Sequence, residues 1–330
     1  MKILIIQTAF IGDVVLATAL AEKLHACHPT AQIHFLLREG NETLLSDHPF
    51  INHIWIWKKR RHKYRNLFRL LFAIRSARFD AVINCQRFAA SGFLAALSGA
   101  GIRTGFSKNP LSFLFTERHA HNVGNKGGGV FLHEVERNQL LIASLTDQDA
   151  ARPKLYPHER DFIAVEKYKS GPYVTICPAS VWSTKQWPPV KWIELVRSIP
   201  EQYSIYLLGA GSDSRLADEI INLEPDRRLR NLCGAFSFLQ TTALMKDAAM
   251  NYVNDSAPLH FASAINANVT AVFCSTIPQF GFGPLSDNSH ILEIREPLHC
   301  RPCGLHGFKE CPEKHFHCAL KVEAKSFLTA

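Results

Sequence analysis

The chain begins with the stretch Met1-Lys2-Ile3-Leu4-Ile5-Ile6-Gln7-Thr8-Ala9-Phe10-Ile11-Gly12-Asp13. A short apolar, β-branched run leads here into a polar turn, and residues 14–25 then repeat apolar side chains at helical spacing. A strand, a tight turn and a helix in this order form the opening unit of a parallel α/β sheet. Because the turn lacks the G-x-G-x-x-G spacing of a dinucleotide site, the stretch disfavours a nicotinamide enzyme.

The same alternation continues through the rest of the first half. Strands are predicted at residues 3–6, 33–37, 54–56 and 81–85, and helices at residues 14–25, 67–74, 88–97 and 134–145. Residues 99–129 are rich in loop-forming residues and include Asn125-Lys126-Gly127-Gly128-Gly129, which we expect to form a mobile flap near a site.

A second α/β pattern follows a linker-like segment over residues 147–157. Strands are predicted at residues 173–177, 205–208, 252–253 and 270–273, and helices at residues 190–198, 214–223, 239–245 and 258–265. A length of 330 residues suits two domains better than one. The sequence therefore predicts an α/β protein with two Rossmann-like domains, residues 1–165 and 166–330, joined by a hinge.

The composition limits the cellular location. The chain is 47% hydrophobic and 20% charged, and no apolar run approaches the roughly 18 residues of a membrane span. The N-terminal run has no small-residue cleavage site, so we expect a cytoplasmic protein. Its nine cysteines are then expected to be free thiols, or metal ligands where they cluster, rather than a disulfide framework.

The net charge of +8 comes from one segment. Residues 48–79 contain nine Lys or Arg and no Asp or Glu, with aromatic residues interleaved. Such a segment suits an anionic membrane surface or a phosphorylated glycolipid acceptor. A solvated helix face remains the alternative, and we expect no nucleic acid because no binding motif accompanies the charge. The residues expected to contact the acceptor or the membrane are Lys58, Lys59, Arg60, Arg61 and Lys63.

Candidate site residues follow the predicted strands, because ligands of parallel sheets bind at the carboxyl ends of strands. Asp13 after the first strand is interpreted either as a helix N-cap or as a base that accepts a proton from an attacking hydroxyl. In the second half, Ser183, Thr184 and Lys185 suit a diphosphate, and the alternative is a capped loop with two packing tryptophans. Asp213 suits ribose hydroxyls, or an ordinary helix cap.

The fourth candidate loop is Asn254-Asp255-Ser256-Ala257-Pro258-Leu259-His260. Asp255 and Ser256 precede a helix with proline near its first turn, a geometry that favours anions. His260 lies about one turn in, and a lone helical histidine is more often structural. Cys300, Cys303, Cys311 and Cys318, with nearby histidines, are candidates for a structural zinc site, and unliganded thiols are the alternative.

Together these motifs resemble glycosyltransferase family 9, the ADP-heptose:lipopolysaccharide heptosyltransferases of Gram-negative bacteria. The resemblance spans the chain and rests on the Gly12-Asp13 turn and three motifs of the second half: Trp182-x-x-Lys185-x-Trp187-Pro188, Gly209-x-x-x-Asp213 and Asn254-Asp255-Ser256-x-x-x-His260. Gln7, Ala9 and Phe10, and the segment of residues 276–284, depart from the best-known members.

The resemblance implies a GT-B fold, in which two Rossmann-like domains face each other across a cleft, and an inverting reaction without a metal cofactor. The first domain would bind the acceptor and the second the nucleotide sugar. Asp13 would be the general base and Lys185 the phosphate ligand. The donor would further contact the residues Asp213, Asp255, Ser256, Ala257 and His260.

The function predicted is transfer of heptose from ADP-heptose to the inner core of lipopolysaccharide or lipooligosaccharide, at the cytoplasmic face of the inner membrane. One alternative is a transferase of the same family with another nucleotide sugar. The other is a non-catalytic, membrane-associated glycolipid-binding protein.

Overall fold

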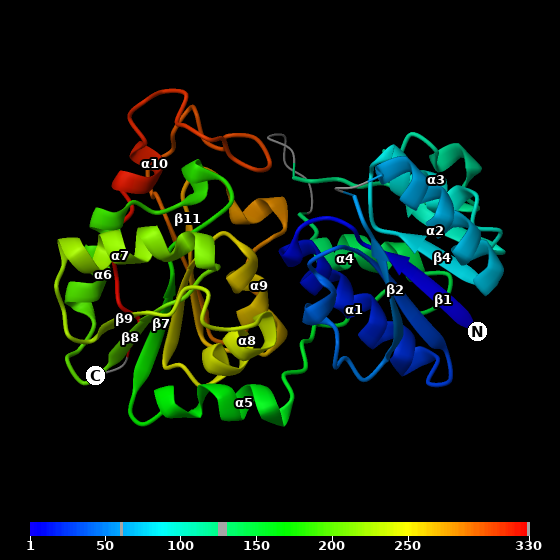
Figure 1. The fold of residues 1–330 in the computed structure, drawn as a ribbon. Helices are drawn as coiled ribbons and strands as arrows, with labels where there is room; N and C mark the ends of the chain where they lie inside the picture. Colours follow the sequence, from blue (N-terminus) through cyan, green and yellow to red (C-terminus); the bar gives the residue numbers. More distant parts are fainter. Residues whose placement is uncertain (60–61, 125–130, 329–330) are drawn as a thin grey trace. The chain divides into compact units, whose positions relative to one another are not determined.

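A computed structural model describes residues 1–59, 62–124 and 131–328 of the chain. It forms two compact units, Met1–Tyr156 and Pro157–Ala330 (Figure 1). The boundary expected at residue 165 lies slightly further along, at the end of helix α5 (Glu159–Val165). That helix packs against α8 (Phe238–Lys246), so it belongs to the second unit.

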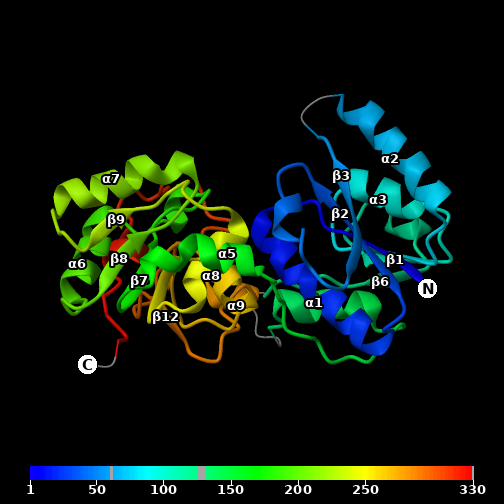
Figure 2. The ribbon, with the colours of Figure 1, turned by 60° about the horizontal axis from the view of Figure 1, so that its bottom comes forward.

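The first unit is a doubly wound α/β domain. Its parallel strands lie in the order β3-β2-β1-β4-β5-β6, the order of dinucleotide-binding folds. Helices α1 and α4 pack together on one face, and α2 and α3 pack together on the other (Figure 2). The strands are β1 (Lys2–Ile6), β2 (Gln32–Arg38), β3 (Ile51–Trp57), β4 (Ala81–Asn84), β5 (Ile102–Phe106) and β6 (Glu117–His119). The helices are α1 (Ile11–Cys27), α2 (Lys63–Ala77), α3 (Ala89–Ala96) and α4 (Glu134–Gln139), with short 3₁₀ turns η1 (Glu42–Leu44), η2 (Ser112–Leu114) and η3 (Leu140–Ile142).

Strands β5 and β6 lie in the stretch that was expected to be loop, so that prediction was wrong. β5 contains Gly105, a weak strand residue, and β6 has three polar residues at the edge of the sheet. Gly105 is required because a side chain there would come within 2.4 Å of the Phe115 ring. The expected flap, Asn125–Gly129, lies outside the described residues.

The second unit repeats the same topology. Its parallel sheet has the order β12-β11-β10-β7-β8-β9, which is the order of the first sheet when counted from β7. The edge strands β9 and β12 were not predicted, because short strands with polar residues give little periodic signal. The strands are β7 (Tyr173–Cys177), β8 (Ser204–Leu207), β9 (Leu229–Asn231), β10 (Met250–Asn254), β11 (Val269–Phe273) and β12 (Ser289–Glu293). The further helices are α6 (Pro189–Ser198), α7 (Ser214–Leu223), α9 (Ala257–Ala264) and α10 (His317–Leu320), with 3₁₀ turns η4 (Glu166–Tyr168), η5 (Ser183–Lys185), η6 (Gly211–Asp213) and η7 (Pro278–Phe280).

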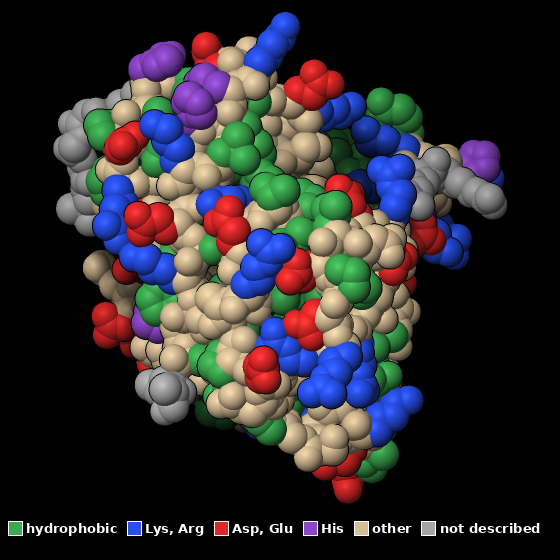
Figure 3. Space-filling model, turned by 90° about the vertical axis from the view of Figure 1, so that its left-hand side faces the viewer, with side chains coloured by type: hydrophobic (Ala, Val, Ile, Leu, Met, Phe, Trp, Pro, Cys, Tyr) green, Lys and Arg blue, Asp and Glu red, His purple; other side chains and the backbone are tan. Residues whose placement is uncertain are grey.

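Charges of both signs are interspersed on the face of the second unit that Figure 3 shows. Exposed ion pairs of this unit include Arg197–Glu224 at 2.7 Å and Lys321–Glu296 at 2.9 Å. Such exposed pairs contribute little to stability. On this face, positive and negative side chains lie next to each other instead of gathering in separate regions. Among the described residues, no helix has the length and apolar character needed to cross a bilayer.

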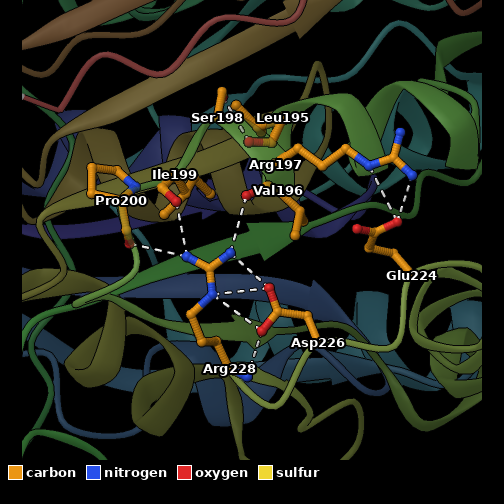
Figure 4. Close-up of polar contacts among 9 residues, drawn as sticks. All are labelled: Leu195, Val196, Arg197, Ser198, Ile199, Pro200, Glu224, Asp226 and Arg228. Atoms are coloured by element: carbon orange, nitrogen blue, oxygen red, sulfur yellow. Dashed lines mark hydrogen bonds and ion pairs between the residues drawn. The ribbon is translucent and has the colours of Figure 1, made fainter.

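Arg228 stabilises the end of α6, at the amino-terminal edge of the second sheet (Figure 4). Its Nη1 donates to the carbonyls of Ile199 (2.8 Å) and Pro200 (3.0 Å), and its Nη2 donates to Asp226 Oδ2 (2.6 Å). The hydrogen bond from Arg228 is the main reason that the pKa of Asp226 lies below its usual value.

We expect Arg228→Ala to lower the free energy of unfolding of this unit by about 2 kcal/mol, because hydrogen bonds to a charged group are lost. Urea unfolding at neutral pH measures the change. Because the pKa of Asp226 is lowered in the folded state, its ionised carboxylate stabilises the fold at pH values above the unfolded-state pKa. This stabilisation is lost as pH falls through the folded-state pKa. The difference between wild type and variant should therefore shrink in acid; a difference that is constant down to the acid transition would contradict the assignment.

Candidate functional site

Each sheet has one switch point, where successive crossover connections leave in opposite directions. In the first unit it lies between β1 and β4, and in the second between β7 and β10. Loops after these strands form a ligand crevice in doubly wound folds. Asp13 follows β1, Lys185 follows β7 and Asp255 follows β10, so the strand order puts all three residues at switch points.

Lys185 and Asp255 form the centre of the site in the second unit. Lys185 Nζ lies 2.7 Å from Asp255 Oδ2, and the side chains are only 15% and 7% exposed. The pair joins the loop after β7 to the loop after β10. A buried ion pair needs further hydrogen bonds to be stable, and Thr276 Oγ1 supplies one to Asp255 Oδ2 at 2.5 Å.

Thr276 and Arg301 belong to this site and were missed from the sequence. Arg301 donates to the carbonyls of Cys274 (2.8 Å) and Thr276 (2.7 Å), and its Nη2 also donates to Glu293 Oε2 (2.7 Å). It thereby holds the turn after β11, which presents Thr276 to Asp255. Thr276 follows a predicted strand, so the carboxyl-end rule could have found it; no local pattern marks Arg301.

Asn254 also links the loop after β10 to the loop after β7. Its Oδ1 accepts from the backbone N–H of Trp187 (3.0 Å), and its Nδ2 donates to the carbonyl of Pro178 (2.7 Å). Trp187 is fully buried and donates from Nε1 to the carbonyl of Ala319 (3.1 Å). Trp187 therefore packs as the alternative interpretation of this loop expected, and it anchors the loop that carries Lys185.

Thr184 and Ser183 occupy different environments. Thr184 is buried, and its hydroxyl accepts from the N–H of Phe308 (2.7 Å) and lies 3.1 Å from the Phe308 carbonyl. Gly307 packs so closely that a side chain there would come within 2.7 Å of Thr184 Oγ1. Ser183 is exposed beside Lys185. We therefore expect Ser183 to be free for a ligand and Thr184 to hold the C-terminal segment against the loop.

Helix α9 begins at Ala257, one residue before the predicted start, with Ser256 as its N-cap and Pro258 in the first turn. Ser256 Oγ donates back to the carbonyl of Asn254 (3.3 Å), and Ala257 is the first helical residue. His260 is buried one turn further, near the Phe282 ring. The first turn of the helix adds the positive end of its dipole to the charge of Lys185.

Asp213 lies at the end of turn η6, before α7. Its Oδ2 accepts from the N–H of Ala210 at 2.8 Å, so the carboxylate caps its own turn. Gly209 is needed here, because a side chain at this position would come within 2.9 Å of Asp213 Oδ2. This contact corresponds to the helix-cap alternative, and the ribose contact stays a prediction.

The cysteine segment lies beside the same loops. All nine cysteines of the chain are free thiols. Across residues 1–59, 62–124 and 131–328, no group of three or more Cys, His, Asp or Glu side chains is arranged to hold a metal ion. The four-cysteine zinc site is therefore not formed in this structure. Burial raises the pKa of the Cys318 thiol to about 12, and Cys303 donates from its backbone N–H to the carbonyl of Ser275 (2.8 Å).

In the first unit, Asp13 is the third residue of α1 and is half-buried. The helix begins at Ile11 with Phe10 as its N-cap, so the interpretation of Asp13 as the N-cap was wrong. A carboxylate in the first turn is still stabilised by the helix dipole. Burial raises the pKa of the Cys85 thiol, and the nearby carboxylates of Glu134 and Asp13 raise it further. Asp13 follows β1, and β1 pairs with β4 up to Ile6 and Asn84, so the two strands end side by side.

Lys59, which follows β3, reaches the carboxyl-terminal end of β1. Its Nζ donates to the carbonyl of Thr8 (2.8 Å) and to Thr8 Oγ1 (3.0 Å). Burial lowers the pKa of Lys59 to about 8, with smaller contributions from Arg38 and Lys63. Gln86 after β4 donates to Gln7 Oε1 at 2.5 Å and ties the two strand ends together.

Lys58 and Lys63, the other two described basic residues of the predicted group, do not take part in these hydrogen bonds. Lys63 is exposed at the start of α2. Lys58 is exposed, and its backbone carbonyl accepts from Asn66 Nδ2 (3.2 Å). Arg60 and Arg61 lie outside the described residues. Of the three described members of the predicted group, Lys59 is therefore the one that the structure brings to the strand ends.

A buried charged cluster lies near the same strand ends and was not predicted. Arg137 Nε donates to Glu134 Oε2 (2.8 Å), and His121 Nε2 lies 3.2 Å from the same oxygen. Burial raises the pKa of Glu134, but the hydrogen bonds and charges of His121 and Arg137 outweigh it, so the pKa lies below its usual value. Arg137 also bonds the carbonyls of Asn122 and Leu132. The cluster joins the chain before and after residues 125–130.

Two solved structures are similar to this chain over most of its length. The Escherichia coli ADP-heptose lipopolysaccharide heptosyltransferase II matches with a TM-score of 0.77 at 22% identity, covering 96% of this chain and 97% of that one. The E. coli heptosyltransferase WaaC with ADP matches with a TM-score of 0.71 at 19% identity, covering 88% and 92%. Two parallel six-stranded sheets that match these structures show that the chain has the GT-B fold.

Sequence comparison identifies the protein family of the chain. The model of glycosyltransferase family 9 (heptosyltransferase) matches residues 67–315, and the chain belongs to this family. Lipopolysaccharide heptosyltransferase 2 of E. coli K12 is 25% identical over 91% of this chain and 90% of its own length. Lipopolysaccharide heptosyltransferase 3 of E. coli is 26% identical over 84% and 85%. The family resemblance inferred from the motifs is confirmed.

Proposed function

We propose that this glycosyltransferase transfers heptose from ADP-heptose to the inner core of lipopolysaccharide or lipooligosaccharide, with inversion at the anomeric carbon and without a metal cofactor. The observation that carries the proposal is the Lys185–Asp255 pair at the switch point of the second unit, at the start of α9. A fixed cation beside a helix N-terminus suits a diphosphate. The names of the relatives support heptose as the sugar.

The second unit is proposed to bind the donor. Lys185, Ser183 and the N–H of Ala257 would contact the diphosphate, while Ser256 and His260 would line the sugar side of the same helix start. Asp213 would contact the ribose. Departure of ADP leaves negative charge on the diphosphate, and a preorganised cation and helix dipole stabilise that charge where a metal ion acts in other enzymes.

The first unit is proposed to bind the acceptor. Asp13 would accept the proton of the acceptor hydroxyl as its oxygen attacks the anomeric carbon; the new C–O bond forms as the bond to the diphosphate breaks. One base is enough for such an inversion. Lys59, held at the strand ends by Thr8, would attract a phosphorylated acceptor. The enzyme would act at the cytoplasmic face of the inner membrane.

The proposal predicts that the purified protein consumes ADP-heptose only when a truncated lipopolysaccharide core is present, and that excess EDTA leaves the rate unchanged. Mass spectrometry of a panel of truncated cores, with other nucleotide sugars as donor controls, measures the product. Transfer from another nucleotide sugar in place of ADP-heptose would identify a different donor. Loss of activity in EDTA that a divalent metal restores would refute the metal-free mechanism, and binding of cores without turnover of any donor would favour a non-catalytic protein.

A further inference from the structure

The outer layer of the first unit, formed by α2, α3 and η2, exposes apolar side chains that the core does not use. On α2, Leu67, Leu70, Leu71 and Ile74 face the sheet and belong to its core cluster. Tyr64, Phe68 and Phe72 are 71%, 51% and 66% exposed. Their spacing of four residues places them in one stripe along the helix, next to the buried face.

The neighbouring elements extend this stripe into a surface. The Phe68 ring lies 5.5 Å from the ring of Phe93 on α3, and Arg75 Nη1 donates to the carbonyl of Leu97 at 2.8 Å. Helix α3 also packs on η2. Phe88 and Phe113, next to α3 and in η2, are 67% and 68% exposed. Figure 2 shows α2 and α3 together on the side of the sheet opposite to α1.

The charges of this layer are almost all positive. Residues 63–116 contain eight Lys or Arg and one acidic residue, Asp80. Asp80 lies at the amino-terminal edge of the sheet, where its Oδ2 accepts from the N–H of Lys2 (2.6 Å). Arg65 and Arg69 are exposed on α2, one turn apart. By contrast with this basic layer, the face of the second unit in Figure 3 carries charges of both signs.

A pocket continues the basic surface to the end of α2. Its volume is about 500 Å³, and Arg75, Arg78, Phe79 and Gly99 line it together with Asp80. Two arginines that line one pocket suit a phosphate. At the other end of the layer, α2 and α3 begin where β3 and β4 end, which is the edge of the sheet that carries Asp13.

We propose that the α2–α3–η2 surface docks on an anionic phospholipid bilayer. Exposed phenylalanines among Lys and Arg fit the interface of a membrane, where the rings enter the acyl boundary and the cations meet phosphate headgroups. A second copy of the chain is a poor partner, because a two-fold contact would place like charges against each other. Docking through this surface would hold the Asp13 edge near lipid-linked acceptors.

The test is co-sedimentation of the full chain with vesicles of phosphatidylcholine, with and without anionic phosphatidylglycerol. Wild type should bind the anionic vesicles, and added salt should weaken this binding. Two double variants, Arg65→Glu with Arg69→Glu and Phe68→Ser with Phe72→Ser, should each lower the binding at least about tenfold. Transfer to a short, water-soluble acceptor should stay at the wild-type rate in both.

Matched controls come from exposed residues of the second unit. Arg227→Glu with Arg230→Glu gives the same change in net charge, and Ile163→Ser with Leu223→Ser removes comparable exposed apolar side chains. Both controls should bind like wild type. The proposal is overturned if wild type ignores anionic vesicles, if the α2 variants bind normally, or if the controls lose binding equally.

Two further outcomes would reassign the surface. A changed oligomeric state in the α2 variants with intact vesicle binding would point to a second copy, and loss of RNA retention with intact vesicle binding would point to nucleic acid. The vesicles contain neither donor nor acceptor, so failure of docking is distinct from failure of the proposed transfer reaction.

Discussion

Asp13→Asn is expected to lower the turnover of ADP-heptose by about 10²- to 10⁴-fold, the usual contribution of a general base. Asparagine has the same shape but cannot take a proton from the acceptor hydroxyl at neutral pH. The donor contacts proposed here all lie in the second unit, so the Kd for ADP-heptose should stay unchanged. Single-turnover rates with a truncated core, and calorimetry with ADP-heptose, measure the two quantities.

A structural role for Asp13 would give a different result. The carboxylate lies in the first turn of α1, and its loss there costs only about 0.3–1 kcal/mol of stability. Glu136 is the matched control, because it is likewise the third residue of its helix, α4, in the same unit. Glu136→Gln should keep the wild-type rate. If Asp13→Asn retained more than a few per cent of the rate, Asp13 would not be the base.

Much of the fold was predictable, because the buried strands of a parallel sheet are continuous apolar runs. β1, β7 and β11 are buried along most of their length, and the prediction placed each within a residue or two. The strands that it missed are short, polar or interrupted by glycine, as in β5, β9 and β12. Such edge strands owe their conformation to pairing with a neighbour, which no local pattern encodes.

The residues of the candidate site were predictable where a charged or polar side chain lies in the loop directly after a strand. Lys185 and Asp255 were both named from that rule, and the structure joins them in one ion pair. Arg301 was not predictable, since it lies far along the chain and acts on backbone carbonyls. The position of Asp13 within α1 was missed for a simpler reason: the helix starts three residues earlier than its apolar pattern suggests, which moves Asp13 from the cap into the first turn.

Lys185→Met is expected to lower kcat/KM for ADP-heptose by about 10²- to 10³-fold, the effect of removing one preorganised group that stabilises developing charge. The substitution also leaves Asp255 as a buried carboxylate without its cation. Breaking a buried pair in this way costs about 3–5 kcal/mol. A loss of activity in the single variant alone would therefore not separate catalysis from folding.

The double variant Lys185→Met with Asp255→Asn separates them, because it removes both charges and leaves an amide that can still accept from Thr276. We expect its thermal stability to return toward wild type while kcat/KM stays low. Lys169→Met is the matched control: Lys169 is 12% exposed and pairs with Asp247 at 2.5 Å, and both residues precede strands rather than follow them. It should alter stability slightly and leave kcat/KM unchanged. A double variant with the kcat/KM of this control would show that Lys185 serves the fold alone, and the diphosphate would then need another cation.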